Sequence, residues 1–388
     1  MWLRHEYVSP RPFPAEGVEG AMLRPYMRQS MMITDSNQIT SQWLTQTLRE
    51  GGSLPTGEVT QLRVVGESSY TSNIAQLIPT YSADAPRTAP ARLWLKLARL
   101  DAQQSVVGAA QRQREVMFHT LIAARMPDAP IIRCYHAAFD EITGASLLLF
   151  DDVSQTHVAG HSTTPPDLTQ GKLVMDAFAT WHAFWWDNPL LREISELPTR
   201  ESVLRDVEGI RATWPRFAGF AGDRLTPEQY RIYERALIAL PRLMQRVTQG
   251  RNLTLIHGDA HLANVMLPIR VQDESGEKAL IIDWQLWGIS YWAEDLANLM
   301  ALHWTRDQRQ GLERDLLQHY YAQLMQHGVR NYSWDACWDD YRLAMIARVL
   351  FMPMWFWVTG ATLDEVWRSL RSATQAYEDL ACDELLRL

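Results

Sequence analysis

The spacing of hydrophobic residues changes once along the chain, and this change constrains the fold more than any other feature. Residues 58–97 contain three runs with the alternation of β-strands, VTQLRVV, IAQLIPTY and ARLWLKLA, separated by turn-forming residues. Beyond residue 152 the apolar residues recur mainly with the spacing of helices. Strands that are followed by helices, rather than alternating with them, predict an α+β fold with two lobes.

The first lobe is expected over residues 34–152. A short helix, SQWLTQTLRE, follows the N-cap residue Thr40 and ends at two glycines. After the three strands, a helix is expected over residues 109–125, and two further strands near 132–139 and 145–150 flank the turn DEITG. The sequence therefore predicts a small antiparallel sheet of five strands with one helix beside it.

The second, larger lobe is expected over residues 153–388 and is predicted to be mainly α-helical. The helices are expected at residues 171–186, 202–214, 227–249, 296–303, 306–327, 338–358 and 363–380. One hairpin, NVMLPIRV and KALIIDW around the turn DESGE, interrupts them. Residues 1–33 are rich in Pro, Met and Arg without a regular period, and we expect them to form a loose leader outside the fold.

The most apolar segment, residues 343–358, is predicted to be a buried, kinked helix. It carries Arg348 at its centre and Pro353 near its end. It is also shorter than the roughly 20 residues that a bilayer requires, so a membrane span is not expected.

Composition excludes several classes of protein. The 388 residues have a formal net charge of −8, with 37 Lys and Arg against 45 Asp and Glu, so no overall basic field would recruit nucleic acid. Three widely spaced cysteines indicate neither a disulfide framework nor a zinc ribbon. Because the N-terminal segment contains prolines and charges where a signal peptide is apolar, we expect a cytoplasmic protein. The oligomeric state cannot be read from the sequence.

The residues with the clearest chemistry lie at residues 255–267, LIHGDAHLANVML, and 280–285, LIIDWQ. Each motif begins with an apolar strand, which delivers Asp259 and Asn264 onto one loop and Asp283 beside it. Two carboxylates and one amide oxygen are ligands that suit Mg²⁺. The spacing from Asp259 to Asn264 is that of the catalytic loop of kinases.

Together these motifs resemble those of the aminoglycoside phosphotransferase and choline kinase superfamily, closest to its ecdysteroid-kinase-like branch. The resemblance extends over about residues 39–377 and implies a protein-kinase-like fold. It also implies an ATP- and Mg²⁺-dependent transferase that moves a phosphoryl group to a hydroxyl of a small-molecule alcohol. In that comparison Asp259 is the catalytic base, and Asn264 and Asp283 hold the metal.

The resemblance assigns roles in the first lobe as well. Lys96, in the third strand, would contact the α- and β-phosphates of ATP, and Glu115 on the next helix would position it. The chain has only three lysines among its 37 cationic residues, so a lysine at this position indicates a site that needs a compact ammonium group instead of a guanidinium. Phe150, Asp151 and Asp152 resemble the hinge whose backbone meets the nucleobase.

The remaining assigned residues cover the phosphates or support the catalytic loop. The segment GESSYTSN is expected to cover the phosphates, with Ser68 and Ser69 supplying donors in a loop that contains a single glycine. His257 and His261 are expected to be structural. Asp295 would support the catalytic loop through its backbone amides.

Two other functions remain open at this stage. A catalytically weak kinase-like binding module would explain the glycine-poor loop. A metal-dependent hydrolase would use His257, Asp259 and His261 as zinc ligands. The sixteen tryptophans, clustered at residues 181–186 and again at Trp355 and Trp357, pack the core or line the acceptor pocket. The sequence identifies neither the acceptor nor the choice between ATP and GTP.

Overall fold

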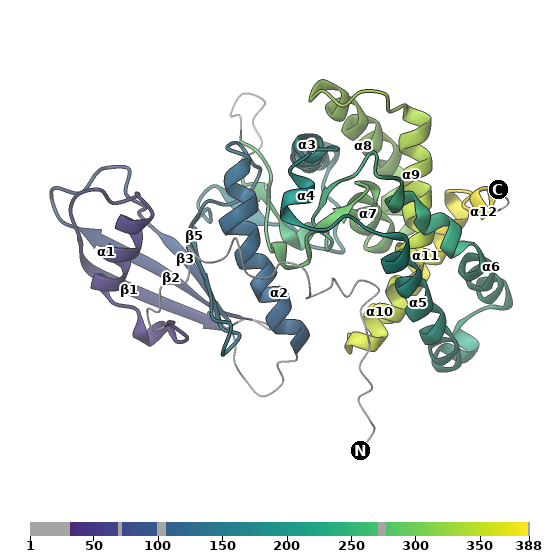
Figure 1. Ribbon diagram of the computed structural model, residues 1–388, viewed down its shortest axis with the longest axis horizontal. Coiled ribbons are helices and arrows are strands. Elements are labelled where there is room, and N and C mark those ends of the chain that lie inside the picture. Colours follow the sequence, from purple (N-terminus) through teal and green to yellow (C-terminus); the bar gives the residue numbers. More distant parts are fainter. Residues whose placement is uncertain (1–31, 69–71, 99–105, 271–276, 387–388) are drawn as a thin grey trace, which may run out of the picture.

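A computed structural model of the protein describes residues 32–68, 72–98, 106–270 and 277–386. A smaller lobe built on a β-sheet lies beside a larger helical lobe, with helix α2 (Val106–Met117) between them (Figure 1). This is the predicted α+β arrangement. Most of the predicted leader and Ser69 lie outside the described residues.

The sheet of the smaller lobe contains five antiparallel strands in the order β1-β2-β3-β5-β4. Their bounds are Val59–Ser68 (β1), Ser72–Tyr81 (β2), Leu93–Ala98 (β3), Cys134–Phe139 (β4) and Ser146–Asp151 (β5). Leu93, Leu95 and Leu97 are fully buried in the core of this lobe, whereas Lys96 is only partly buried. The alternation in the sequence therefore places Lys96 on the face away from that core.

Helix α1 (Ser41–Glu50) begins as predicted at Thr40, whose hydroxyl accepts a hydrogen bond from the amide of Trp43. The second predicted helix is present but irregular, because α2 continues into a π-helical turn (Phe118–Ile122) and then a 3-10 turn (Ala123–Arg125). Phe118, the first residue of the π-helical turn, lies in the core of the larger lobe. Its ring stacks on that of Trp284, with ring centroids 4.2 Å apart. Helix α2 is thus anchored to both lobes.

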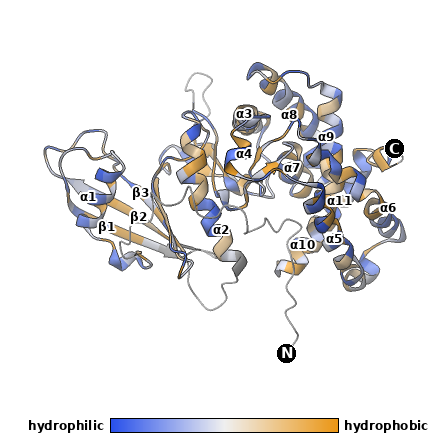
Figure 2. Ribbon diagram, in the orientation of Figure 1, coloured by the Kyte–Doolittle hydropathy of each residue, from blue (hydrophilic) through white to orange (hydrophobic). Residues whose placement is uncertain are grey.

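The larger lobe is mainly helical, as predicted. Its helices are α3 (Leu168–Trp185), α4 (Leu191–Ile194), α5 (Arg200–Ala221), α6 (Pro227–Leu243), α7 (Ala293–Ala297), α8 (Arg306–Gln326), α9 (Trp334–Ala347), α10 (Met352–Thr359), α11 (Leu363–Asp379) and α12 (Asp383–Leu386). Orange and blue segments are interleaved on helices such as α2 in Figure 2, as expected where one helix face is buried and the other exposed.

Short strands position the loops of the larger lobe. The predicted hairpin is present as β8 (Val265–Pro268) paired with β9 (Leu280–Ile281). Two pairings were not predicted: β6 (His157–Ala159) extends this hairpin beside β8, and β7 (Thr254–Ile256) pairs with β10 (Gly288–Ser290). Strands β6 and β10 have three residues each, too few for an alternation that would reveal them or their partners in the sequence.

The apolar segment predicted as a kinked helix is broken at Arg348, between α9 and α10. Arg348 has φ −123° and ψ −63°, and a 3-10 turn (Val349–Phe351) leads into α10, where Pro353 lies in the first turn. Among the described residues, this is the one helical stretch long and apolar enough to cross a bilayer by length and composition alone. Its most apolar part is 56% buried within the fold, as is typical of a core helix.

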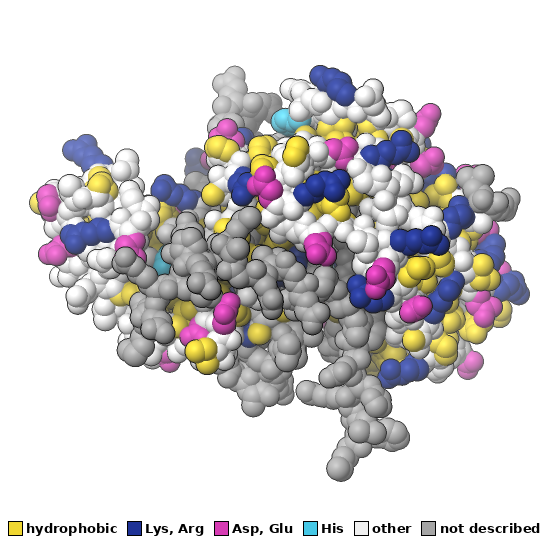
Figure 3. All heavy atoms as spheres, in the orientation of Figure 1, with side chains coloured by type: hydrophobic (Ala, Val, Ile, Leu, Met, Phe, Trp, Pro, Cys, Tyr) yellow, Lys and Arg dark blue, Asp and Glu magenta, His cyan; other side chains and the backbone are white. Residues whose placement is uncertain are grey.

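Tryptophans fill much of the core of the larger lobe. The largest fully buried side chains include six of them, at positions Trp181, Trp185, Trp284, Trp287, Trp292 and Trp304. On the face drawn in Figure 3, acidic and basic side chains are interspersed over the larger lobe. The described residues of that face therefore present no continuous basic stripe to a nucleic-acid backbone.

Candidate active site

The loop that follows strand β7 requires glycine at position 258. Gly258 has φ +82°, and a Cβ atom there would lie 2.1 Å from the carbonyl oxygen of Leu286. This tight approach lets the chain turn sharply between His257 and Asp259. The glycine of the His-Gly-Asp motif is thus explained by packing and backbone geometry.

Asp295, at the start of α7, holds the loop from below. Its carboxylate accepts hydrogen bonds from the amides of His257, at 2.7 Å, and Gly258, at 2.9 Å, and contacts Nε2 of His182 at 3.2 Å. Burial alone would raise the pKa of Asp295, but the hydrogen bond and charge of His182 outweigh it and lower the pKa. Asp295 is therefore an ionised, fully buried anchor for the loop.

His257 is fully buried, and both of its ring nitrogens have partners. Nε2 lies 2.8 Å from the carbonyl oxygen of Ile282, and Nδ1 accepts a hydrogen bond from the amide of Asp259 at 3.2 Å. A neutral imidazole satisfies this pattern. Because these contacts occupy the ring, His257 is not placed to bind zinc. Within the described parts of the chain, no group of three or more His, Cys, Asp or Glu side chains has the geometry of a metal site.

Asp259 presents its carboxylate to solvent at the mouth of this loop. Its side chain is 32% exposed, and Nε2 of His261 lies 3.7 Å from Oδ2. Asn264 donates from Nδ2 to the carbonyl oxygen of Asp259 at 3.0 Å. This bond fixes the orientation of the amide, so Oδ1 of Asn264 points away from Asp259. The loop thus holds one accessible carboxylate beside one oriented amide oxygen.

Asp283 joins the loop to the smaller lobe. It has the left-handed conformation φ +66°, ψ +59°, an uncommon one for a residue other than glycine. Its Oδ1 lies 2.7 Å from Nζ of Lys96, and the same ammonium contacts both oxygens of Glu115, at 2.8 and 2.9 Å. Residues from β3, α2 and the end of β9 therefore meet around one lysine.

The pKa values of Lys96, Asp283 and Glu115 are shifted in different directions by their contacts and by burial. Burial lowers the pKa of Lys96, but the charges of Glu115 and Asp283 outweigh burial and raise it. For Asp283, burial acts against ionisation, yet the charge of Lys96 lowers the pKa overall. For Glu115, which is 2% exposed, burial dominates and raises the pKa. Lys96 is charged, and Asp283 is the carboxylate that stays ionised most readily.

The residues assigned to the hinge are tied into the sheet. The amide of Asp151 donates to the backbone carbonyl oxygen of Arg133 at 2.9 Å, and the carboxylate of Asp152 accepts from Gln76 at 2.7 Å and from Trp94 at 2.8 Å. Side-chain contacts of Asp152 therefore tie this segment to strands β2 and β3, and its contact with a nucleobase stays a prediction. Ser68 ends strand β1, and Ser69 lies outside the described residues, so their contacts with phosphate stay predictions.

One neighbour of the hinge was not identified from the sequence. His119, in the π-helical turn after α2, packs edge-on against Phe150 with ring centroids 5.0 Å apart. Burial lowers the pKa of His119 to about 3, so the ring is neutral. A single histidine within a helix gives no sequence signal for such a position.

A cavity in the larger lobe lies near the loop that carries Gly258 and Asp259. Its volume is about 50 Å³, and it is partly open to solvent. The lining is mostly aliphatic and aromatic, with Glu294 and Arg348 as its charged members; it also includes Ile210, Met244, Val247, Tyr291, Ala347, Phe351, Met352 and Trp355. Arg348 connects the cavity to the loop, because its Nη2 donates to the carbonyl oxygen of Gly258 at 2.7 Å. Sequence analysis did not assign Glu294 or Arg348 to the site.

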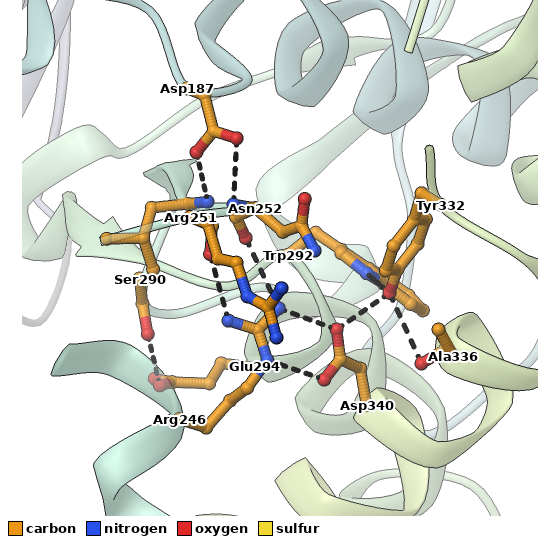
Figure 4. Close-up of polar contacts among 11 residues, drawn as sticks. Asp187, Arg246, Arg251, Asn252, Ser290, Trp292, Glu294, Tyr332, Ala336 and Asp340 are labelled. Carbon is orange, nitrogen blue, oxygen red and sulfur yellow. Dashed lines mark hydrogen bonds and ion pairs between the residues drawn. The ribbon is translucent and has the colours of Figure 1, made fainter. Parts of the chain in front are cut away.

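A polar network joins several elements of the larger lobe, including the segment that carries Glu294 (Figure 4). Arg246 makes two hydrogen bonds of 2.8 Å to the carboxylate of Asp340, which also accepts one from Tyr332. Ser290 donates to the carboxylate of Glu294. The bonds of Arg246 join the 3-10 turn after α6 to helix α9, and Trp292, between β10 and α7, donates to the hydroxyl of Tyr332 at 2.7 Å, which adds the β10–α7 segment to the network.

Comparison with known proteins agrees with this geometry. The sequence model of the Ecdysteroid kinase-like family matches residues 199–330, roughly a third of the chain. No curated protein matches the sequence. The predicted resemblance to the ecdysteroid-kinase-like branch is confirmed over residues 199–330.

Solved structures resemble this chain to different degrees, and the first of those below, with a TM-score above 0.5, indicates the fold. A protein from Ralstonia eutropha JMP134, provisionally assigned as an aminoglycoside phosphotransferase, is 13% identical, with a TM-score of 0.53 over 88% of this chain and 98% of its own. Choline kinase LicA from Streptococcus pneumoniae is 12% identical, with a TM-score of 0.47 over 87% and 98%. Choline kinase from Cryptosporidium parvum Iowa II is 10% identical, with a TM-score of 0.49 over 89% and 98%. The chain has the two-lobed protein-kinase-like fold.

Proposed function

We propose that the protein is an ATP-dependent phosphotransferase that moves the γ-phosphoryl group to a hydroxyl of a small molecule. The observation that carries this proposal is that Lys96 contacts both Glu115 and Asp283. Asp283 lies 187 residues after Lys96 in the chain. A lysine held between a helix glutamate and a metal-binding aspartate is the arrangement that kinases use to grip ATP.

Asp259 is the catalytic base in this proposal. Its carboxylate is exposed at the mouth of the loop and is fixed through the backbone, so it can orient an acceptor hydroxyl. The hydroxyl oxygen attacks the γ-phosphorus while its proton passes to the carboxylate of Asp259. The bond between the γ-phosphorus and the bridging oxygen breaks, and ADP leaves. Most of the rate enhancement would come from alignment and charge neutralisation.

The oxygen atoms around the loop fit Mg²⁺. Asp283 supplies a carboxylate whose pKa is lowered, and Oδ1 of Asn264 is turned away from Asp259 by the hydrogen bond at Nδ2. One or two protein oxygens, completed by phosphate oxygens, is the usual ligand set of Mg²⁺ in phosphotransferases. The ion would neutralise the charge of the phosphates, while Lys96 exchanges its contact with Asp283 for the phosphate oxygens.

The cavity beside Gly258 is the natural place for the acceptor. Arg348 lines it and contacts the residue directly before Asp259, so an alcohol in the cavity would be near the base. Its aliphatic and aromatic lining favours an acceptor that places a small apolar group in the cavity over a polycation. Only a few polar groups would be needed to orient such a molecule.

Nucleotide-dependent stabilisation tests this proposal. Thermal unfolding is measured with ATP, GTP and ADP, each with and without Mg²⁺, for the wild type, Asp283→Ala and the exposed control Asp223→Ala. A nucleotide present at a hundredfold over its dissociation constant stabilises the protein by about 2.7 kcal/mol. We expect a Mg²⁺-dependent shift in the wild type and the control that is absent in Asp283→Ala. No shift in the wild type with any of the nucleotides would contradict the proposal.

A further inference from the structure

Arg348 has a position that the sequence alone does not explain. It is a charged residue in the middle of the most apolar segment of the chain, where burial of an unpaired guanidinium would be costly. The helix breaks at this residue, between α9 and α10, and its side chain remains 22% exposed. The break in the helix therefore lets the side chain of Arg348 reach partly exposed space instead of being buried among apolar residues.

The guanidinium contacts both the loop that carries Asp259 and Glu294, another residue that lines the cavity. Nη2 donates to the carbonyl oxygen of Gly258 at 2.7 Å, and Nε lies 3.9 Å from a carboxylate oxygen of Glu294. Glu294 is held in turn by the hydroxyl of Ser290 (Figure 4). One side chain thus spans from the wall of the cavity to the catalytic loop.

The peptide unit between Gly258 and Asp259 is held at both ends. Its carbonyl oxygen accepts the bond from Arg348, and its N–H donates to Nδ1 of His257 at 3.2 Å. Because a peptide unit is planar, two opposed contacts fix the rotation of the whole plane. That plane ends at the Cα atom of Asp259 and so sets the direction in which its carboxylate projects.

Arg348 differs from the other residues that hold this loop. His257 and Asp295 are buried to 0% and 1% exposure, beyond the reach of a molecule in the cavity. Arg348 is partly exposed and lines the cavity itself. Of the three residues Arg348, His257 and Asp295, Arg348 is therefore the one that an acceptor bound in the cavity would touch.

We propose that Arg348 is a positioning residue that orients Asp259 by holding the carbonyl oxygen of Gly258 from within the acceptor cavity. This inference rests on the proposed phosphotransferase function. It goes beyond that function by assigning to Arg348 the alignment of the base, a role distinct from binding ATP or the metal. Loss of such alignment lowers kcat, whereas the KM for ATP changes little, because Lys96 and Asp283 are untouched.

The test compares three variants of the full-length protein. Arg348→Met keeps much of the apolar stem and removes the donors, and Arg348→Lys keeps the charge. Arg330→Met is the matched control, because Arg330 also donates to backbone carbonyls, of Met325 and Val329, but lies in the loop after α8. Amide hydrogen exchange of peptides covering residues 255–262 is measured together with steady-state ATP turnover.

We expect faster exchange in residues 255–262 for Arg348→Met, and a kcat lower by roughly 100-fold, the scale of a misplacement of about 1 Å. The KM for ATP should stay within about twofold. Added guanidinium ion at millimolar concentration should restore part of kcat, and Arg348→Lys should fall between the wild type and Arg348→Met. Arg330→Met should match the wild type in exchange and kcat.

Unchanged exchange in Arg348→Met, or faster exchange without a loss of kcat, would overturn the inference. A loss of kcat that guanidinium does not restore, accompanied by a lower melting temperature, would reduce Arg348 to a structural residue and also overturn it. If the wild type turns over no ATP, the proposed function fails, and the exchange comparison alone then decides whether Arg348 holds the loop. The two failures are thereby distinguished.

Discussion

Replacement of Asp295 by asparagine removes one charge from the centre of the site while the shape is kept. In the wild type, Oδ2 accepts from the amide of His257 and contacts Nε2 of His182, and Oδ1 accepts from the amide of Gly258. An asparagine has a single acceptor oxygen. Its better orientation places that oxygen at the Oδ2 position, where it retains two partners, and turns its NH₂ group toward the N–H of Gly258.

The cost follows from these contacts. A hydrogen bond to a charged group contributes about 1.5–3 kcal/mol, and one such bond, to Gly258, is lost. The two bonds that remain become neutral, and neutral bonds are about half as strong. We therefore expect Asp295→Asn to lower the free energy of unfolding by about 3–6 kcal/mol. Because two donors then face each other at Gly258, ATP turnover should also fall by roughly 100-fold.

Chemical denaturation and ATP turnover check this prediction, with Asp379→Asn as the control. Asp379 also has a lowered pKa and binds Arg306 and Arg309, far from the loop, so its replacement should cost stability but not turnover. The folded-state pKa of Asp295 lies below its unfolded value of about 3.9, so its stabilisation is present above that pH and is lost as pH falls through the folded value. The difference between wild type and Asp295→Asn should be constant from about pH 8 to pH 5 and narrow below about pH 4. A variant within 1 kcal/mol of wild type at pH 7 (the scale of an ordinary surface change) would refute the reasoning.

Two further substitutions test other parts of the site. Lys96→Met removes the positive charge that lowers the pKa of the buried Glu115, so the already raised pKa of that carboxyl should rise further. The melting temperature of the variant should then fall more steeply than that of the wild type as pH increases above about 4.3. Equal pH dependence of the two melting temperatures would contradict this. Gly258→Ala should abolish turnover and destabilise the fold, because the new Cβ atom would clash with the carbonyl oxygen of Leu286. Gly250→Ala is the control: its φ is +65° and no atom lies near its Cβ, so it should show only the backbone strain of about 1–3 kcal/mol. Melting curves and ATP consumption of the two alanine variants distinguish a steric clash from strain.

The main features of the fold were predictable because the hydrophobic periods are long. Five strands and the predicted helices of the larger lobe are present, although the helix expected at 227–249 changes to a 3-10 turn after residue 243. The helix expected at 296–303 begins at Ala293 and becomes π-helical at Asn298. Such changes depend on packing with other elements, which a single segment does not encode.

The candidate site was predictable where residues have a fixed spacing in a motif. The structure brings Lys96 to Glu115 and Asp259 to Asn264 as that spacing implies. It also adds the contact of Lys96 with Asp283, and partners that lie in remote segments, such as His182 beneath Asp295. His182 is one aromatic residue within a tryptophan-rich run, so nothing in the sequence separates it from its neighbours.

Arg348 shows the limit of the sequence argument most clearly. An arginine within an apolar run indicates that the segment does not cross a membrane, and the sequence supports no more than that. Its contact with Gly258 depends on how the broken helix packs against a loop 90 residues earlier. Long-range partners of this kind require the three-dimensional structure.

The central claim is that Asp259 acts as the base of an ATP-dependent phosphotransferase. Its most direct test is ATP consumption by wild type and Asp259→Asn in the presence of Mg²⁺ and a panel of alcohols, with products detected by mass spectrometry. We predict that the wild type adds one phosphoryl group to at least one alcohol. Asp259→Asn should bind Mg²⁺-ATP normally in a thermal-shift titration yet lose turnover by about 100-fold or more, because proton acceptance and hydroxyl orientation are removed. Equal turnover by the two proteins would contradict the claim.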